Sequence, residues 1–166
     1  MPARSRTARL TLILALVLAG EVLFPAISDA GDITAFLAWA APRENWSRGY
    51  GAAISSTWFK VLTFEGEAAR MPGLTTDSAM TSFTASAMIS PPIKELTPYG
   101  GIGYGLFRQT TTSDSDIGRL RALILGVKTR IKDLLVLKAE YRRLDLSGTP
   151  LRTMDSRISV GAGIAF

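Results

Sequence analysis

The stretch that decides the fold is Ser-Arg-Ile-Ser-Val-Gly-Ala-Gly-Ile-Ala-Phe, residues 156 to 166. Side chains of an extended strand point alternately to its two faces. One face here carries only apolar side chains (Ile158, Val160, Ala162, Ile164 and Phe166), whereas the other begins with Arg157 and Ser159 and continues with small residues. The pattern predicts a strand with one face toward lipid or another apolar phase and the other toward polar groups.

The opposite end of the chain, residues 1 to 30, has the pattern of a cleaved export signal. Three arginines precede an apolar run over residues 10 to 19. A membrane-spanning helix needs about 20 apolar residues, so this run is too short to span and reads as the core of a signal peptide. Small residues at 28 to 30 predict cleavage before Gly31, with cleavage after Gly20 as the alternative.

The remaining 136 residues are enough for one domain and too few for two of ordinary size. Without the signal, the net charge is +4, and the basic residues are dispersed without a nucleic-acid motif. We therefore expect no nucleic-acid partner, and we expect outer-membrane lipid and lipopolysaccharide as neighbours. The chain has no cysteine, so its stability has to come from strand pairing rather than disulfides.

Alternation recurs along the mature chain in eight segments, each long enough to cross a bilayer at a tilt. The predicted strands cover residues 32 to 41, 48 to 56, 58 to 68, 79 to 89, 97 to 108, 118 to 131, 134 to 145 and 155 to 166. Polar connections at 43 to 47, 70 to 78, 109 to 116 and 146 to 154 alternate with tighter ones at 55 to 57, 91 to 95 and 132 to 133. We therefore expect an all-β protein, an eight-stranded antiparallel up-and-down transmembrane β-barrel over residues 31 to 166, preceded by the cleaved signal peptide.

Two stretches and the last residue carry a resemblance to a known family. Thr97-Pro-Tyr-Gly-Gly-Ile-Gly-Tyr-Gly105 resembles the Pro-Tyr-x-Gly-x-Gly-x-Gly central strand of the opacity-protein and outer-membrane-protein-A-like small barrels. Residues 126 to 142 resemble the family's penultimate hairpin, which ends in Leu-x-x-Glu-Tyr-Arg. The resemblance implies insertion in the outer membrane of a Gram-negative-type bacterium. It also implies that the terminal Phe166 is the assembly signal presented to the barrel assembly machinery.

Charged residues repeatedly fall on the strand face that would point into the barrel. With eight strands the interior is just wide enough for side chains, and unpaired charges there would cost several kcal/mol each. We therefore predict a luminal ion network, although the pairing depends on a barrel shear that the sequence does not reveal. Its predicted members are Glu65, Glu67, Lys128, Arg130, Lys138, Glu140, Arg142 and Arg157.

Catalysis and cofactor binding are disfavoured by the residues present. The chain has no histidine, so the Ser-His-acid chemistry of lipid-modifying barrel enzymes is excluded, and no Ser-x-x-Lys pairing replaces it. Glu65 and Glu67 could form the carboxylate pair of a glycoside hydrolase, but the ion network is favoured. The acidic pair Asp114 and Asp116 lacks the other residues of a calcium loop, and the glycines at 101 to 105 lack nucleotide-loop spacing. We expect no cofactor and no bound metal.

The sequence thus predicts an integral outer-membrane protein with a structural or surface-interaction role and no enzyme activity. A narrow channel for small or apolar solutes is the alternative. A lipid-modifying barrel enzyme and a periplasmic lipocalin-like binder are less favoured. No host or surface ligand can be identified from the residues.

Overall fold

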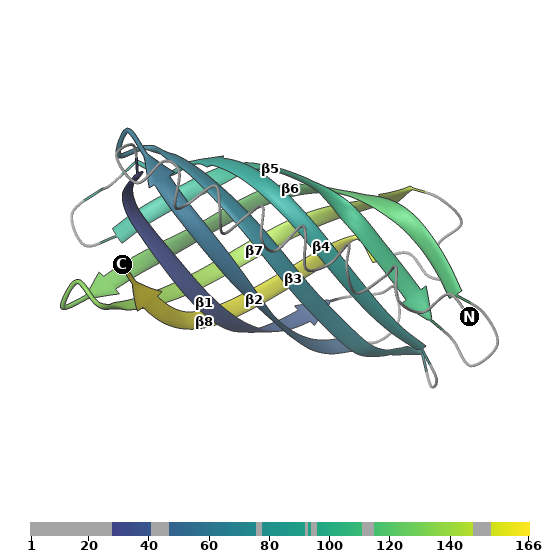
Figure 1. Ribbon diagram of the computed structural model, residues 1–166. Coiled ribbons are helices and arrows are strands. Elements are labelled where there is room, and N and C mark those ends of the chain that lie inside the picture. Colours follow the sequence, from purple (N-terminus) through teal and green to yellow (C-terminus); the bar gives the residue numbers. More distant parts are fainter. Residues whose placement is uncertain are drawn as a thin grey trace, which may run out of the picture.

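The computed structural model describes residues 28–40, 47–75, 78–91, 93, 96–110, 115–147 and 154–166, and its strands close into one barrel (Figure 1). The strands are β1 (Ser28–Ala40), β2 (Ser47–Trp58), β3 (Leu62–Thr75), β4 (Ser78–Ile89), β5 (Leu96–Thr110), β6 (Ser115–Ile131), β7 (Leu135–Ser147) and β8 (Ser156–Ala165). Each pairs antiparallel with the next, and β8 pairs with β1. The predicted eight-stranded antiparallel barrel is therefore confirmed. In the described part of the chain, no helix has the length and hydropathy needed to cross a membrane.

The connection between β2 and β3 lies later than predicted. The sequence placed it at residues 55 to 57, but β2 continues to Trp58 and the turn is at Phe59 and Lys60, with φ of 51° and 64°. The amide of Val61 donates to the carbonyl of Trp58 at 3.2 Å, which closes a four-residue turn. The serines and threonine at 55 to 57 are buried, so their hydroxyls belong to the strand rather than to a turn.

The predicted polar connection at 70 to 78 is mostly strand. β3 and β4 remain paired through Met71 opposite Met80 and Pro72 opposite Ala79, with a register shift before Thr75. Met71 is buried and Pro72 is exposed, so alternation continues across the proline. Residues 76 and 77 lie outside the described residues, as do 41 to 46, 111 to 114 and 148 to 153, which include most of the other predicted polar connections.

The two ends of the barrel differ in their connections. At one end lie the turn at Phe59 and Lys60, the predicted turn at Lys132 and Asp133, and Phe166. We call this the turn end; it is on the left in Figure 1, where the chain terminus is marked C. The connections that follow β1, β3, β5 and β7 belong to the opposite end of the barrel, which we call the loop end.

The wall of the barrel is apolar outside and mostly polar or small inside. Large apolar side chains are exposed on all eight strands, for example Leu37 (60 %), Phe83 (54 %) and Ile102 (68 %). On β8 the predicted apolar face is exposed, whereas Arg157 and Ser159 are buried. The face assignment made from alternation is therefore confirmed for this strand.

Three aromatic rings inside the barrel lie against glycines directly opposite them on a neighbouring strand. These pairs are Phe36 with Gly51, Tyr99 with Gly126, and Phe107 with Gly118. A Cβ atom at any of the three glycines would overlap the ring. The wall therefore provides room for each ring by omitting the side chain opposite it.

The glycines of residues 101 to 105 have a different surrounding. A Cβ at Gly101 or Gly105 would run into the backbone of β4, and one at Gly103 would meet Ser86 Oγ at 2.8 Å. These glycines permit close approach of β4 and β5.

Candidate functional site

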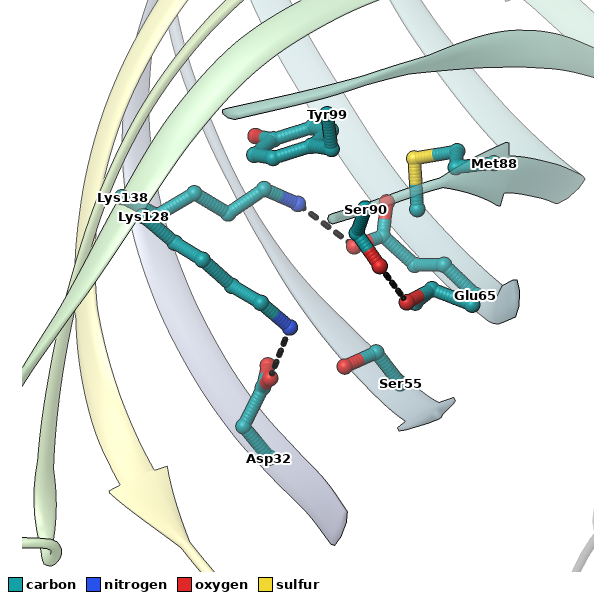
Figure 2. A pocket seen from close by; sticks show the side chains of 9 residues that line it. Asp32, Ser55, Glu65, Met88, Ser90, Tyr99, Lys128 and Lys138 are labelled. Carbon is teal, nitrogen blue, oxygen red and sulfur yellow. Dashed lines mark hydrogen bonds and ion pairs between the residues drawn. The ribbon is translucent and has the colours of Figure 1, made fainter. Parts of the chain in front are cut away.

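The lumen at the turn end is lined by hydroxyls and one isolated ion pair. Lys128 Nζ lies 3.2 Å from Asp32 Oδ2 (Figure 2), and both side chains are buried. Thr63 Oγ1 is 2.9 Å from Thr57 Oγ1 and also contacts Ser90 Oγ, which links β2, β3 and the end of β4. Between them is a cavity of about 10 Å³, room for about one water molecule.

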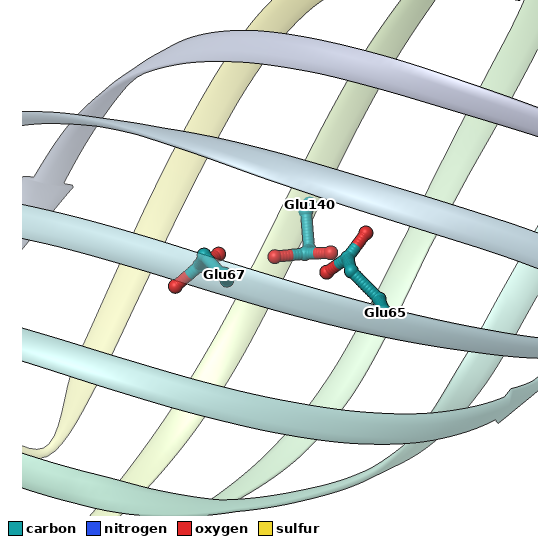
Figure 3. Close-up of side chains that lie close together, drawn as sticks. All are labelled: Glu65, Glu67 and Glu140. Atoms are coloured by element: carbon teal, nitrogen blue, oxygen red, sulfur yellow. The ribbon is translucent and has the colours of Figure 1, made fainter. Parts of the chain in front are cut away.

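Three carboxylates from two strands meet in the middle of the lumen (Figure 3). Glu65 and Glu67 are two residues apart on β3 and so share its inner face, while Glu140 points in from β7. One oxygen of each lies within 4.8 Å of the others, and all three side chains are buried. Such a cluster of like charges is stable only with cations between its members.

Arg142 is the central cation of this cluster. Its Nη2 lies 2.7 Å from Glu65 Oε1 and 2.9 Å from Glu67 Oε2, and its Nε lies 2.5 Å from Glu140 Oε1. The side chain is 1 % exposed. A planar guanidinium with five N–H donors suits this position, because it can donate in several directions from one buried site.

Lys138 and Arg157 complete the neutralisation. Lys138 Nζ lies 2.5 Å from Glu65 Oε2 and 3.1 Å from Glu140 Oε2, and Arg157 Nη2 lies 2.7 Å from Glu67 Oε2. Three acids therefore meet three bases, and the charges cancel inside the barrel. We call these six residues, Glu65, Glu67, Lys138, Glu140, Arg142 and Arg157, the charged belt.

Two aromatic rings flank the charged belt. The Tyr99 hydroxyl donates to Glu140 Oε2 at 3.0 Å, and Lys138 Nζ lies 5.4 Å from the centre of the same ring. Arg157 Cζ lies 5.3 Å from the centre of the Phe36 ring. These distances permit cation–π attraction, which is strengthened where water is excluded.

Beyond the charged belt, the lumen toward the loop end is mostly apolar, and its buried Gln109 donates to Met80 Sδ at 3.8 Å. We call the buried side chains there the apolar plug: Met71, Met80, Phe107, Leu120, Leu144 and Met154. Met71 and Met80 are directly opposite each other on β3 and β4. The described lumen is thus filled in three layers: hydroxyls with one ion pair, the charged belt, and the apolar plug.

The structure brings together most, but not all, of the residues expected in a luminal network. Six form the charged belt, and Lys128 pairs separately with Asp32. Arg130 is exposed near the turn end of β6, and none of the salt bridges among the described residues includes it. The reason is position: β6 ends at Ile131, so Arg130 has passed the depth of the acids.

Sequence reasoning missed Asp32 and the Tyr99 hydroxyl. Asp32 lies on the same strand face as Thr34 and Phe36, so alternation in β1 was the signal that would have placed it inside. Phe166 is exposed at the closing seam, where its amide and carbonyl exchange hydrogen bonds with Gly31 at 3.0 and 2.9 Å. The predicted cleavage position before Gly31 lies within β1, and residues 1 to 27 lie outside the described residues.

The belt geometry does not suit the carboxylate pair of a glycoside hydrolase. Glu65 and Glu67 are each 5 % exposed, and each contacts at least one lysine or arginine. A general acid or nucleophile has to reach a substrate, and these oxygens are occupied inside a filled lumen.

Comparison with known proteins supports the fold. No protein-family model and no curated protein sequence matches the chain. Neisserial surface protein A superposes with a TM-score of 0.60 at 18 % identity, covering 82 % of this chain and 94 % of that one. Ail, the attachment invasion locus protein of Yersinia pestis, gives 0.58 at 17 % identity, with coverage of 84 % and 100 %. It has also been solved with the heparin analogue sucrose octasulfate.

The N-terminal β-barrel domain of OprF from Pseudomonas aeruginosa gives a TM-score of 0.62 at 14 % identity, covering 84 % of this chain and 99 % of that domain. These structures are small eight-stranded outer-membrane β-barrels. At such identities the likeness shows the fold alone. The fold implied by the sequence resemblance is confirmed.

Proposed function

We propose that this chain is an integral outer-membrane β-barrel with a structural or surface-interaction role and no catalysis. The observation that carries the proposal is the ring of exposed apolar side chains on all eight strands, combined with charges buried inside. Transfer of apolar surface out of water is favourable by about 25 cal/mol per Å². A closed barrel also pairs all the hydrogen-bonding groups of its backbone, as the lipid interior requires. A periplasmic lipocalin-like binder would need the reverse arrangement, a polar exterior around an apolar cavity.

Membrane fractionation tests the location. We expect the native chain in detergent extracts of the outer membrane, migrating differently on gels before and after boiling, because a closed barrel resists unfolding by detergent. Recovery as a soluble periplasmic monomer would overturn the proposal. The same preparation reports whether the export signal is removed before Gly31, as proposed from the sequence.

A substitution on the wall tests insertion directly. Leu137 is 40 % exposed on the outer face of β7, next to the buried Lys138. Leu137→Arg should reduce insertion, because a cation on a barrel's lipid face costs up to about 2 to 4 kcal/mol, the cost being largest at the midplane. Leu137→Phe is the matched control and should insert normally; equal insertion of both variants would count against a lipid-facing wall.

The channel alternative is disfavoured by the three filled layers. A solute path would have to cross both the charged belt and the apolar plug, which use different chemistry. We expect liposomes containing the folded protein to release small ions and sugars no faster than empty liposomes. Steady release that scales with the amount of folded protein would favour the channel.

Orientation and assembly complete the proposal. We infer that the loop end faces the cell exterior, since outer-membrane barrels have their longer loops there. A cysteine introduced at residue 112 should then be labelled on intact cells, and one at residue 93 should not.

From the family resemblance, Phe166 would serve the assembly machinery, so its deletion should lower outer-membrane levels while refolding in detergent survives.

A further inference from the structure

We propose that the outer wall of β5, β6 and β7 near the loop end binds the phosphates of lipopolysaccharide. Four outward-facing arginines would hold them: Arg108, Arg119, Arg121 and Arg143. We call this set the arginine face. The inference rests on the proposed outer-membrane location, because only there does this part of the wall meet such a glycolipid.

Strand register places the four arginines in one continuous row. Arg119 and Arg121 are two residues apart on the outer face of β6. Leu106 is opposite Arg119, which puts Arg108 diagonal to it, and Leu123 is opposite Arg143, which puts Arg143 diagonal to Arg121. Neighbours of these kinds are about 7 Å apart, so the row extends over about 20 Å.

The arginine face lacks sufficient negative charge of its own. All four side chains are exposed, and none belongs to a salt bridge among the described residues. Asp145, exposed directly opposite Arg121 on the same outer face, is the acidic residue that the strand register places within the row, so four arginines and one aspartate leave this face with a net charge of +3. The charged belt is internally neutral and offers no compensation. Like charges at this spacing repel, and the repulsion grows where the surroundings are apolar.

The surroundings of the arginine face are apolar, which selects the kind of anion. Leu106, Ile117 and Leu123 are exposed among the arginines, at 54 %, 66 % and 52 %. A ligand covering this face therefore needs acyl chains as well as anionic groups. A row of four guanidinium groups also favours a headgroup with more than one phosphate, because arginine binds phosphate through paired N–H donors.

The arginine face is confined to one side of the barrel. β1 and β4 contain no lysine or arginine, and Arg157, the single one in β8, points into the lumen. β2 and β3 present two outward arginines near the loop end, Arg48 and Arg70. A general attraction to anionic membranes would not depend on which side of the barrel is changed, so these two provide the control.

The test uses purified protein folded in detergent micelles, with binding of fluorescent lipopolysaccharide as the measurement. R119Q/R121Q should bind about tenfold to thirtyfold more weakly than the unchanged chain, since each arginine contributes about 1 kcal/mol near an anionic lipid surface. R48Q/R70Q should stay within about twofold. R121Q/R143Q provides a second variant with the same expected loss.

Competition identifies the ligand chemistry. Dephosphorylated lipopolysaccharide should bind the unchanged chain as weakly as intact lipopolysaccharide binds R119Q/R121Q, and phosphatidylglycerol should compete poorly. Equal loss in R48Q/R70Q, equal competition by phosphatidylglycerol, or displacement by sucrose octasulfate at lower concentrations than by lipopolysaccharide would overturn the inference. Failure of the proposed function is distinguishable, because the protein would then show no heat-modifiable folded form in detergent.

Discussion

The charged belt and the apolar plug fill the same tube at different depths with opposite chemistry. In the belt, Arg142 alone contacts three carboxylates, so each group depends on named partners at fixed distances. In the plug, Phe107 and the methionines contribute volume, and many arrangements of similar volume would serve. The comparison distinguishes two ways of filling the lumen of a narrow barrel: by paired charges and by the packing of apolar side chains.

The largest effect should come from removing the central cation of the belt. Arg142→Met keeps much of the volume but leaves three acids with two bases. We expect the free energy of unfolding to fall by about 3 to 5 kcal/mol, as when one partner of a buried ion pair is removed. Urea unfolding in phosphatidylcholine vesicles, followed by tryptophan fluorescence, measures it.

The neighbouring residue is the control for this prediction. Arg143 is exposed on the outer face of β7, and Arg143→Met should change stability by no more than about 0.5 kcal/mol in the absence of lipopolysaccharide. Equal losses at 142 and 143 would mean that the belt charges do not contribute in the way their geometry indicates.

The plug should respond to volume. Phe107 is 1 % exposed, and Phe107→Ala should cost about 3 kcal/mol through lost burial and the cavity left behind. Phe107→Leu should cost less than about 1.5 kcal/mol.

Arg142→Lys keeps its charge, but an ammonium cannot reproduce the separate Nε and Nη2 contacts. If Phe107→Leu proves worse than Arg142→Lys in the same unfolding assay, the two layers do not differ as described.

The smallest effect should come from the edge of the belt. Tyr99→Phe removes the hydroxyl that donates to Glu140 and leaves Lys138 and Arg142 in place. We expect a loss of about 1 kcal/mol, the usual net contribution of one hydrogen bond. Tyr104→Phe, on the outer face of the same strand, should be neutral. A loss at residue 99 as large as that of Arg142→Met would make the hydroxyl an essential member of the belt.

Most of the fold could be predicted because successive residues of a barrel strand face the outside and the lumen in turn, and these two environments favour different side chains. Alternation alone assigned Ile158 to the outside and Arg157 to the inside. It failed where polar residues belong to a strand: the hydroxyls at 55 to 57 resemble a turn, but Ser55 and Thr57 line the lumen, and Ser56 on the outer face accepts a hydrogen bond from Trp58 Nε1. The real turn uses positive φ at Phe59 and Lys60, which are not residues that favour it.

The members of the belt were largely predictable, but their partners were not. Facing follows from period two, whereas contact between β3 and β7 depends on how far each strand is staggered around the closed barrel. Arg130 shows the consequence, because it keeps the right spacing from Lys128 yet lies beyond the acids. Tyr99 was identified as part of the motif at 97 to 105, and its contact with Glu140 depends on the space over Gly126, which the sequence does not show to be its neighbour.

The aromatic rings opposite glycines also have a consequence for how the barrel closes. The hairpin of β5 and β6 contains two such pairs, eight residues apart along β5. A sliding error of two residues preserves which side chains face inward, so facing alone would not reject it. It would, however, bring Tyr99 against Ile124 or Lys128 instead of Gly126. The two rings together therefore favour a single register for this hairpin. A larger residue at either glycine would be tolerated best together with a smaller residue in place of the aromatic ring opposite it.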